Sequence, residues 1–255
     1  MKNPRRKGRA RATCAAKANG RGDGPSLKTL LLFDIDGTLV LTGGAGGRAM
    51  TRAFEDLYGV SNAFGGVPFN GRTDAWILSQ AAANHGVSPD ALHAFKPLYL
   101  EYLAVELEKP GPRKGVMPGV RELLDSLSLR DDVFLALLTG NFEQGARIKL
   151  EHFDLWRYFP CGAFGDTVHD RNRLLPVALA SVEGFGGLRA DAADAIIIGD
   201  TPLDVGVALS GGARAVAVAT GSHTTHELHT CGAHAVFEDF SDLDAVLAAL
   251  QKSES

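Results

Sequence analysis

Short apolar runs alternate with amphipathic helical patterns along most of the chain. Four runs of mainly Leu, Ile, Val and Ala pass into polar residues and glycine, and a weaker fifth follows; they lie at 28–38, 133–141, 195–202, 214–221 and 234–239. Helical patterns accompany them at 118–128, 142–151, 174–184, 202–210 and 241–251. Buried runs of this kind are typical of parallel strands, and their alternation with helices predicts an α/β fold with a doubly wound parallel sheet.

Residues 43–115 interrupt this alternation. They carry three helical patterns, at 45–57, 73–85 and 89–108, between a Gly-rich segment and a segment rich in Pro, Gly and Lys. We interpret them as a helical cap inserted after the first strand, with residues 27–42 and 116–255 forming the α/β core. Flexible connections suit a lid that closes over a site. The alternative is a set of extra helices that pack permanently against the core.

Residues that can bind a cation or an anion stand where the predicted strands end. In chain order they are Asp34, Asp36, Thr139, Gly140, Asn141, Asp200 and Asp204. Ligands of open α/β sheets bind beyond the carboxyl ends of the strands. Neighbouring carboxylates repel each other unless a cation or a shared proton relieves them, and magnesium prefers oxygen ligands. A hydroxyl and free N–H groups at a helix start can hold an anion, although each piece alone could also be a turn or a helix cap.

The composition narrows the class of protein. The chain has 255 residues, of which 45% are hydrophobic and 22% charged, and this suits a globular protein with a substantial core. No run approaches the roughly 20 apolar residues of a membrane span, so no membrane is expected as a partner. The three cysteines are far apart and form neither a disulfide framework nor a zinc spacing. We therefore expect a reducing, cytoplasmic location.

The start of the chain differs in charge from the rest. Residues 1–22 contain eight Lys and Arg residues and no acid, although the whole chain has a net charge of -4. Because this segment is rich in Gly, Ala and Arg and lacks apolar residues for a core, we expect a disordered basic tail at residues 1–26. It has no apolar region of the kind found in secretory signals. Weak attraction to nucleic acid is the alternative interpretation, but nucleic acid is not expected as a partner.

Together these pieces resemble the haloacid dehalogenase superfamily. Residues 34–39, DIDGTL, match its first motif DxDGT; Thr139 matches the Ser or Thr of its second motif; and residues 199–204, GDTPLD, match its fourth motif GDxxxD. Within the superfamily the chain looks like hydrolases of the phosphoglycolate-phosphatase type with a small helical cap. The resemblance implies a Rossmann-like core and a magnesium-dependent phosphatase that acts on a small phosphorylated metabolite.

The resemblance also implies a role for each matched residue. Asp34 would attack phosphorus and become an aspartyl phosphate, while Asp36 would protonate the leaving alcohol and then activate water. Magnesium would bind the Asp34 carboxylate, the Asp36 carbonyl and the Asp200 carboxylate, with Asp204 supporting the metal or a cationic side chain. The groups that hold phosphoryl oxygens would be Thr139, the N–H groups of Gly140 and Asn141, and Arg171.

The third motif of the superfamily departs from its usual pattern. The family usually places a Lys before the helix that leads to the fourth motif, but residues 169–180, HDRNRLLPVALA, contain none. Arg171 and Arg173 are the candidates to replace it, and we prefer Arg171. A guanidinium can bind phosphate through two N–H groups, so the positive charge would be retained.

Substrate selection is expected to lie with the cap. Arg48 and Arg72 are candidates to contact an anionic substrate, and a solvated helix face is the alternative for both. The series His223, His226 and His229 is interpreted as a solvated helix face, since it lacks an acid ligand pattern. Two alternative functions remain open: a sugar-phosphate mutase of the same superfamily, and a catalytically idle binding protein.

Overall fold

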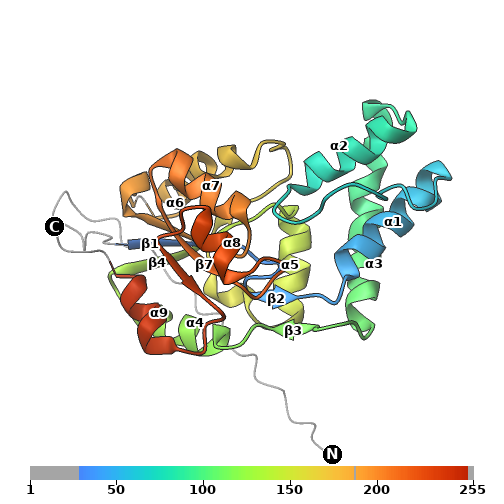
Figure 1. Cartoon of the computed structure of the whole chain (residues 1–255). Helices are drawn as coiled ribbons and strands as arrows, with labels where there is room; N and C mark the ends of the chain where they lie inside the picture. Colours follow the sequence, from blue (N-terminus) through green and yellow to red (C-terminus); the bar gives the residue numbers. More distant parts are fainter. Residues whose placement is uncertain (1–28, 187, 252–255) are drawn as a thin grey trace, which may run out of the picture.

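A six-stranded parallel sheet forms the centre of the molecule, in the strand order β5-β4-β1-β6-β7-β8 (Figure 1). The computed structural model describes residues 29–186 and 188–251; the basic tail predicted at residues 1–26 lies outside them. The strands are β1 (Thr29–Phe33), β4 (Val133–Leu138), β5 (Gly162–Ala163), β6 (Ala195–Gly199), β7 (Arg214–Val218) and β8 (Ala235–Phe237).

Helices cover both faces of the sheet and also extend beyond one end of it. The α-helices are α1 (Ala45–Tyr58), α2 (Asp74–His85), α3 (Phe95–Glu108), α4 (Val120–Ser128), α5 (Glu143–His152), α6 (Leu174–Gly186), α7 (Pro202–Gly211), α8 (Thr225–Thr230) and α9 (Leu243–Ala249). Short 3-10 helices are η1 (Pro89–Ala94), η2 (Trp156–Tyr158), η3 (Arg171–Arg173) and η4 (Ala192–Asp194). Across the described ranges, none of these helices has the length and apolarity needed to cross a membrane.

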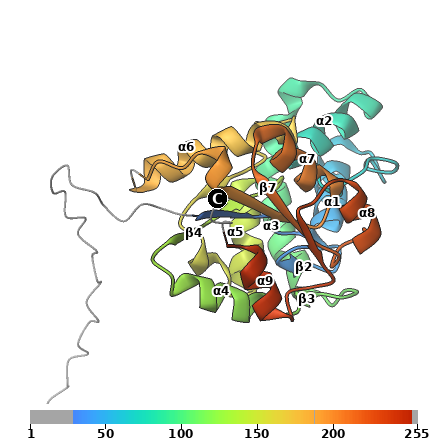
Figure 2. The same ribbon diagram turned by 60° about the vertical axis from the view of Figure 1, so that its left-hand side comes forward.

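The long apolar strands are buried because their alternate side chains enter two different layers, as β1 shows. Leu31 and Phe33 of β1 belong to a cluster that includes residues of α4, α5 and α9. Leu30 and Leu32 belong to a second cluster, which includes residues of α6 and α7. Figure 2 shows α6 and α7 on one side of the sheet and α4 and α9 on the other. The predicted doubly wound parallel α/β sheet is therefore confirmed.

Strand order and register bring three strand ends together. β1 lies between β4 and β6, and Phe33 is level with Leu137 on one side and Ile198 on the other. The residues that follow these strands consequently emerge at the same edge. This is the switch point of an open α/β sheet, where such folds bind their ligands.

The helices α1, α2 and α3 pack on one another in a separate apolar cluster, which also includes Phe142 of the core. Figure 1 shows them beyond the end of the sheet at which β1 and β4 finish. A short antiparallel ribbon of β2 (Val40–Leu41) and β3 (Gly115–Val116) joins the two chain segments that lead to and from these helices. The segment predicted as a cap is thus a helical body with its own core.

Two details of the fold differ from the sequence prediction. The helix expected over 89–108 is divided into η1 and α3, and Pro97, in the first turn of α3, disfavours a continuous α-helix because it cannot donate to the carbonyl of His93. The edge strand β5 and the β2–β3 ribbon were not predicted. Each of these strands has only two residues, which is too short for a recognisable apolar pattern.

Candidate active site

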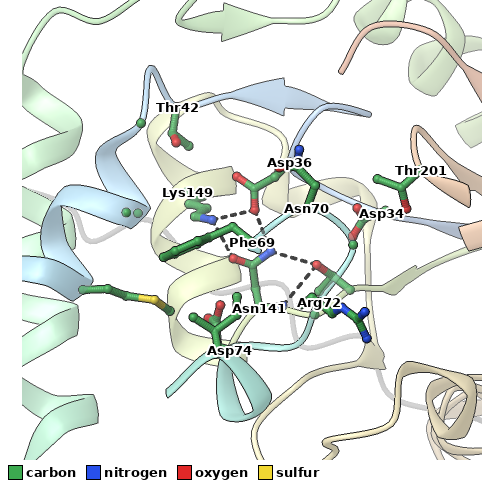
Figure 3. Close-up of a pocket in the computed structure, with 18 of the residues that line it drawn as sticks. Asp34, Asp36, Thr42, Phe69, Asn70, Arg72, Asp74, Asn141, Lys149 and Thr201 are labelled. Carbon is green, nitrogen blue, oxygen red and sulfur yellow. Dashed lines mark hydrogen bonds and ion pairs between the residues drawn. The ribbon is translucent and has the colours of Figure 1, made fainter. Parts of the chain in front are cut away.

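A cavity of about 320 Å³ lies between the carboxyl ends of β1, β4 and β6 and the helices α1, α2 and α3. It contains most of the residues singled out from the sequence. Those that line it are Asp34, Asp36, Arg72, Thr139, Gly140, Asn141, Arg171 and Asp200. Figure 3 shows side chains from the sheet edge and from the helical body pointing into the same space.

The chain turns sharply after β1, and this turn places the two first aspartates. The Asp34 N–H donates to the Ile198 carbonyl at 2.9 Å, which continues the pairing with β6. Gly37 has φ of 86°, a left-handed conformation that favours glycine, and its N–H donates to the Val40 carbonyl at 2.9 Å. A Cβ at Gly37 would also overlap the Asp200 carboxylate. Glycine is therefore required both by the turn and by the space beside Asp200.

Three buried carboxylates meet at this turn. Oxygen atoms of Asp34, Asp200 and Asp204 lie within 4.8 Å of one another, and each residue is at most 5% exposed. Burial raises the pKa of Asp34 to about 6, and the charges of Asp204 and Asp36 add to this while Arg171 opposes it. Burial, together with the charges of Asp204 and Asp34, raises the pKa of Asp200 well above its ordinary value. The cluster thus has an excess of negative charge that a cation would offset.

The donor set fits a magnesium ion. Carboxylate oxygens are the ligands that this hard cation prefers, and the Asp34 and Asp200 carboxylates both border the cavity. A Cβ on Gly221 would overlap the Asp200 carboxylate, so the chain leaves room around it. Asp204 differs, because both its oxygens have protein partners: Oδ2 accepts from the N–H and hydroxyl of Thr201, and Oδ1 pairs with Arg171.

Arg171 and Arg173 occupy different environments. Arg171 is buried, and its Nη2 lies 3.2 Å from Asp34 Oδ1 as well as in contact with Asp204 Oδ1. Its Nε is buried without a hydrogen-bond partner among the described residues. Arg173 is exposed. Of the two arginines considered for the third motif, Arg171 is therefore the one that lies at the carboxylate cluster.

The segment after β4 forms a pocket wall with polar groups on its inner side. Thr139 Oγ1 accepts hydrogen bonds from the N–H and the side-chain Nδ2 of Asn141, at 3.3 and 2.8 Å. Its own hydroxyl hydrogen is therefore available to another acceptor. A Cβ on Gly140 would overlap the Arg72 carbonyl, so only glycine fits between this wall and α2.

Lys149 and Tyr99 are among the cavity residues that were not identified from the sequence, and Asp74 belongs to the segment 71–74 that was considered only for contact with an anionic substrate. Lys149, on α5, lies 2.6 Å from Asp36 Oδ2 and is 4% exposed. Its position three residues after Ala146 puts it on the buried face of that helix, a signal that the sequence contained. Asp74 and Tyr99 belong to α2 and α3, and no local pattern marks them as neighbours of the sheet edge.

Asp74 links the helical body to the core. Its N–H donates to the Gly140 carbonyl at 2.7 Å, and its Oδ2 accepts from the Phe142 N–H at 2.9 Å. Burial raises the pKa of Asp74 to about 7, although the charge of Lys149 and the bond from Phe142 oppose the shift. The carboxyl thus joins the start of α2 to the start of α5.

The two arginines proposed for substrate contact are placed differently. Arg72 borders the cavity, with its guanidinium 4.6 Å from the centre of the Trp76 ring. Arg48 is not among the lining residues; its guanidinium donates to Glu106 Oε2 at 2.8 Å and to the Gly43 carbonyl at 2.6 Å. It therefore fastens α1 to α3 and to the connecting segment.

The histidine series lies away from this site. His226 and His229 are exposed on α8, and His223 precedes that helix. In the part of the chain that the structure describes, the group of three or more His, Cys, Asp or Glu ligands suited to a metal ion is that of Asp34, Asp200 and Asp204. The interpretation of the series as a solvated face agrees with this exposure.

Comparison with known proteins identifies the family. The sequence profile described as "Haloacid dehalogenase-like hydrolase" matches residues 31–218. "Probable phosphatase IndB" of Dickeya dadantii is 30% identical over 236 residues, covering 90% of this chain and 97% of that protein. The phosphoglycolate phosphatase of Rhodospirillum rubrum is 30% identical over 218 residues, covering 84% of this chain and 88% of that protein.

A solved structure agrees with these sequence relatives. The crystal structure of a predicted phosphatase from Clostridium acetobutylicum superposes with a TM-score of 0.65 at 20% identity, covering 88% of this chain and 99% of that one. This similarity shows a shared fold. Because the family profile matches well over half of the chain, the resemblance noted from the motifs is confirmed. The chain belongs to the haloacid dehalogenase-like hydrolase family, and its curated relatives include named phosphatases.

Proposed function

We propose that this protein hydrolyses a small phosphomonoester in a magnesium-dependent reaction, through a phosphoryl group carried transiently by Asp34. The observation that carries the proposal is the convergence of Asp34, Thr139, Arg171 and Asp200 on one cavity, although they come from four separate stretches of sequence. An acid nucleophile, a hydroxyl, a guanidinium and a metal-binding acid are the groups that phosphoryl transfer requires.

The phosphoryl group would lie over the end of β1. Arg171, the hydroxyl of Thr139 and the N–H of Gly140 would provide hydrogen-bond donors there, as would the N–H of Asn141, which in this structure donates to Thr139 Oγ1 at 3.3 Å. The unpartnered Nε of Arg171 is a further donor, and a guanidinium suits a phosphate because it can donate two parallel hydrogen bonds. Asp204 and Asp34 both contact Nη2 of this guanidinium, which helps to set its orientation before substrate binds.

The Asp34 and Asp200 carboxylates, with the Asp36 carbonyl, would hold magnesium. When bound, the ion supplies positive charge that offsets the repulsion between the substrate phosphate and the carboxylates. Asp204, whose oxygens are already engaged by Thr201 and Arg171, supports the guanidinium.

The reaction would proceed in two displacements at phosphorus. In the first, Asp34 forms an O–P bond as the bond between phosphorus and the leaving oxygen breaks, and Asp36 gives its proton to that oxygen. In the second, Asp36 takes a proton from water, the water oxygen bonds to phosphorus, and the Asp34 carboxylate is released. The environments of the two acids suit different roles, since Asp34 is 5% exposed while the Asp36 side chain is 41% exposed.

The helical body would act as a cap that selects the substrate. The cavity is at the small end of the usual range for ligand pockets, roughly 300–1,000 Å³, and this favours a compact metabolite. Met50, Phe69, Ile77 and Tyr99 line it on the cap side. Arg72, at the rim, is the arginine that we propose for contact with an anionic group of the substrate. The relatives named phosphoglycolate phosphatase make phosphorylated small acids the first substrates to assay.

The decisive test is phosphate release from p-nitrophenyl phosphate and from a panel of phosphorylated metabolites, each with magnesium and with EDTA. We expect turnover with magnesium, none in EDTA, and none for Asp34→Asn. Isomerisation of a sugar phosphate without phosphate release would indicate a mutase instead. Binding of phosphorylated compounds without any turnover would indicate an idle binding protein.

A further inference from the structure

Lys149 is a buried cation in the cavity to which the mechanism above gives no role. Its Nζ donates to Asp36 Oδ2 at 2.6 Å and to Asn141 Oδ1 at 2.6 Å (Figure 3). Helix α1 approaches closely, since a Cβ on Gly46 would lie 3.6 Å from this nitrogen. Burying an ammonium group is costly unless it is paired and hydrogen-bonded. The position of Lys149 therefore depends on these two partners.

The contact with Lys149 determines how the Asn141 amide is oriented. An ammonium group only donates hydrogen bonds, so the amide must turn its oxygen toward Lys149. The amide nitrogen then faces away and donates to Asp36 Oδ2 at 2.8 Å and to Thr139 Oγ1 at 2.8 Å. With the amide reversed, its oxygen would face the Asp36 carboxylate and its nitrogen would face the Lys149 ammonium, so both of these contacts would be lost.

Both donors reach the same oxygen of Asp36. Oδ2 accepts from Lys149 and from Asn141, while Oδ1 has no hydrogen bond within residues 29–186 and 188–251. An oxygen that accepts two N–H donors cannot also carry the proton that Asp36 must deliver. The proton is therefore left to Oδ1. The Asp36 side chain is 41% exposed, and Lys149 and Asn141 are its side-chain hydrogen-bond partners among the described residues.

We propose that Lys149 is a positioning residue for proton transfer: with Asn141 it holds Oδ2 of Asp36, so that Oδ1 faces the oxygen of the leaving group. This inference rests on the proposed phosphatase function. In the first displacement, the bond from phosphorus to the leaving oxygen breaks, the Asp34 O–P bond forms, and the proton passes from Asp36 Oδ1 to the leaving oxygen. Lys149 itself touches neither the phosphoryl group nor that proton.

The test compares two esters that differ in their need for a proton. An aryl leaving group such as p-nitrophenolate departs readily without one, whereas an alkoxide needs protonation. The quantity to compare is kcat/KM, because it reports only the steps up to departure of the leaving group. For Lys149→Met we expect kcat/KM for an alkyl phosphate to fall by about 10²-fold, the lower part of the range for general acid catalysis. The value for p-nitrophenyl phosphate should fall by less than about fivefold, roughly 1 kcal/mol of transition-state stabilisation.

Arg147→Met is the matched control. Arg147 is an exposed cation on the same helix, paired with Glu151 at 2.8 Å, and its loss should change neither rate constant. In the Asp36→Asn background, Lys149→Met should add no further leaving-group dependence, since the group that it positions is already absent. If Lys149→Met lacks a cooperative unfolding transition, Lys149→Gln, which keeps an N–H donor for Asn141, provides the same comparison.

Two results would overturn the inference. Equal loss of kcat/KM for both esters would show that Lys149 only maintains the fold of the site. A rise in KM confined to substrates with a second anionic group, with kcat unchanged, would show that Lys149 binds substrate directly. Failure of the proposed function is distinguishable from both, because the wild-type protein would then hydrolyse neither ester.

Discussion

Replacing Asp200 by Asn should affect stability in opposite directions with and without magnesium. In the metal-free protein, Asp200 contributes a third buried negative charge within 4.8 Å of the other two carboxylates. At an effective dielectric constant of about 20, two unit charges at that distance repel by about 3–4 kcal/mol. Asn keeps the size of the side chain and can still accept the hydrogen bond from the Thr38 hydroxyl, which is 3.1 Å long in the structure.

The stabilisation expected from Asp200→Asn is smaller than the summed repulsion of Asp200 by Asp34 and Asp204. Arg171 attracts Asp200 and offsets part of the two like-charge interactions, and the raised pKa allows the carboxyl to take up a proton instead of remaining charged. We therefore expect Asp200→Asn to raise the free energy of unfolding by about 1–3 kcal/mol in EDTA at pH 8. At about 2–4 °C per kcal/mol for a chain of this size, the midpoint of thermal unfolding should rise by about 2–12 °C.

Magnesium should reverse the order. An ion present at 1,000 times its dissociation constant stabilises the native state by about 4.1 kcal/mol, which exceeds the expected advantage of the variant in EDTA, and the variant should gain little because it lacks one ligand. The assay is thermal unfolding followed by circular dichroism in EDTA and across a magnesium titration, with the exposed Asp131→Asn as control. A variant that is less stable than wild type in EDTA, and that responds equally to magnesium, would refute the account of the carboxylate cluster.

Three further outcomes follow from the geometry. Gly140→Ala should lower kcat/KM by at least about tenfold in phosphatase assays, because the new methyl group would overlap the Arg72 carbonyl and move the phosphate-binding wall; unchanged kinetics would contradict this packing. Arg171→Met should weaken competitive inhibition by inorganic phosphate by about tenfold or more, whereas Arg173→Met should leave it unchanged. Because the pKa of Asp74 is raised to about 7, the native state holds this proton more tightly than the unfolded chain, so its contribution to stability is complete below pH 4 and is lost as pH rises toward 7. In urea unfolding, the free energy of unfolding of Asp74→Asn relative to wild type should therefore rise by up to about 4 kcal/mol between pH 4 and pH 7. If this difference between variant and wild type stays constant with pH, the carboxyl is not buried as described.

The sequence predicted the parts of this molecule that have local signals. The apolar runs ending at Asp34, Thr139 and Asp200 are long enough to identify parallel strands, and the rule that ligands bind at the carboxyl ends then brings these residues to one edge. Arg171 was preferred to Arg173 from the sequence, and the structure buries Arg171 beside Asp34 and leaves Arg173 exposed.

Other features depend on contacts between distant segments. Asp74 and Tyr99 reach the cavity only because α2 and α3 pack over the end of the sheet. Arg48, predicted to be near substrate, is instead bound to Glu106, 58 positions further along the chain. Lys149 had a local signal in the apolar face of α5, but its partner Asp36 lies 113 positions away. Pairings at such separations follow from the fold and not from neighbouring residues.

The most direct test of the central claim is chemical trapping of the phosphorylated aspartate. The protein is mixed with magnesium and substrate, quenched in acid during turnover and reduced with borohydride, which converts an aspartyl phosphate to homoserine. Peptide mass spectrometry should then find homoserine at position 34, and none when magnesium is omitted or when Asp34→Asn is used. Phosphate release that continues with Asp34 unmodified, or homoserine at a different acid, would contradict the account.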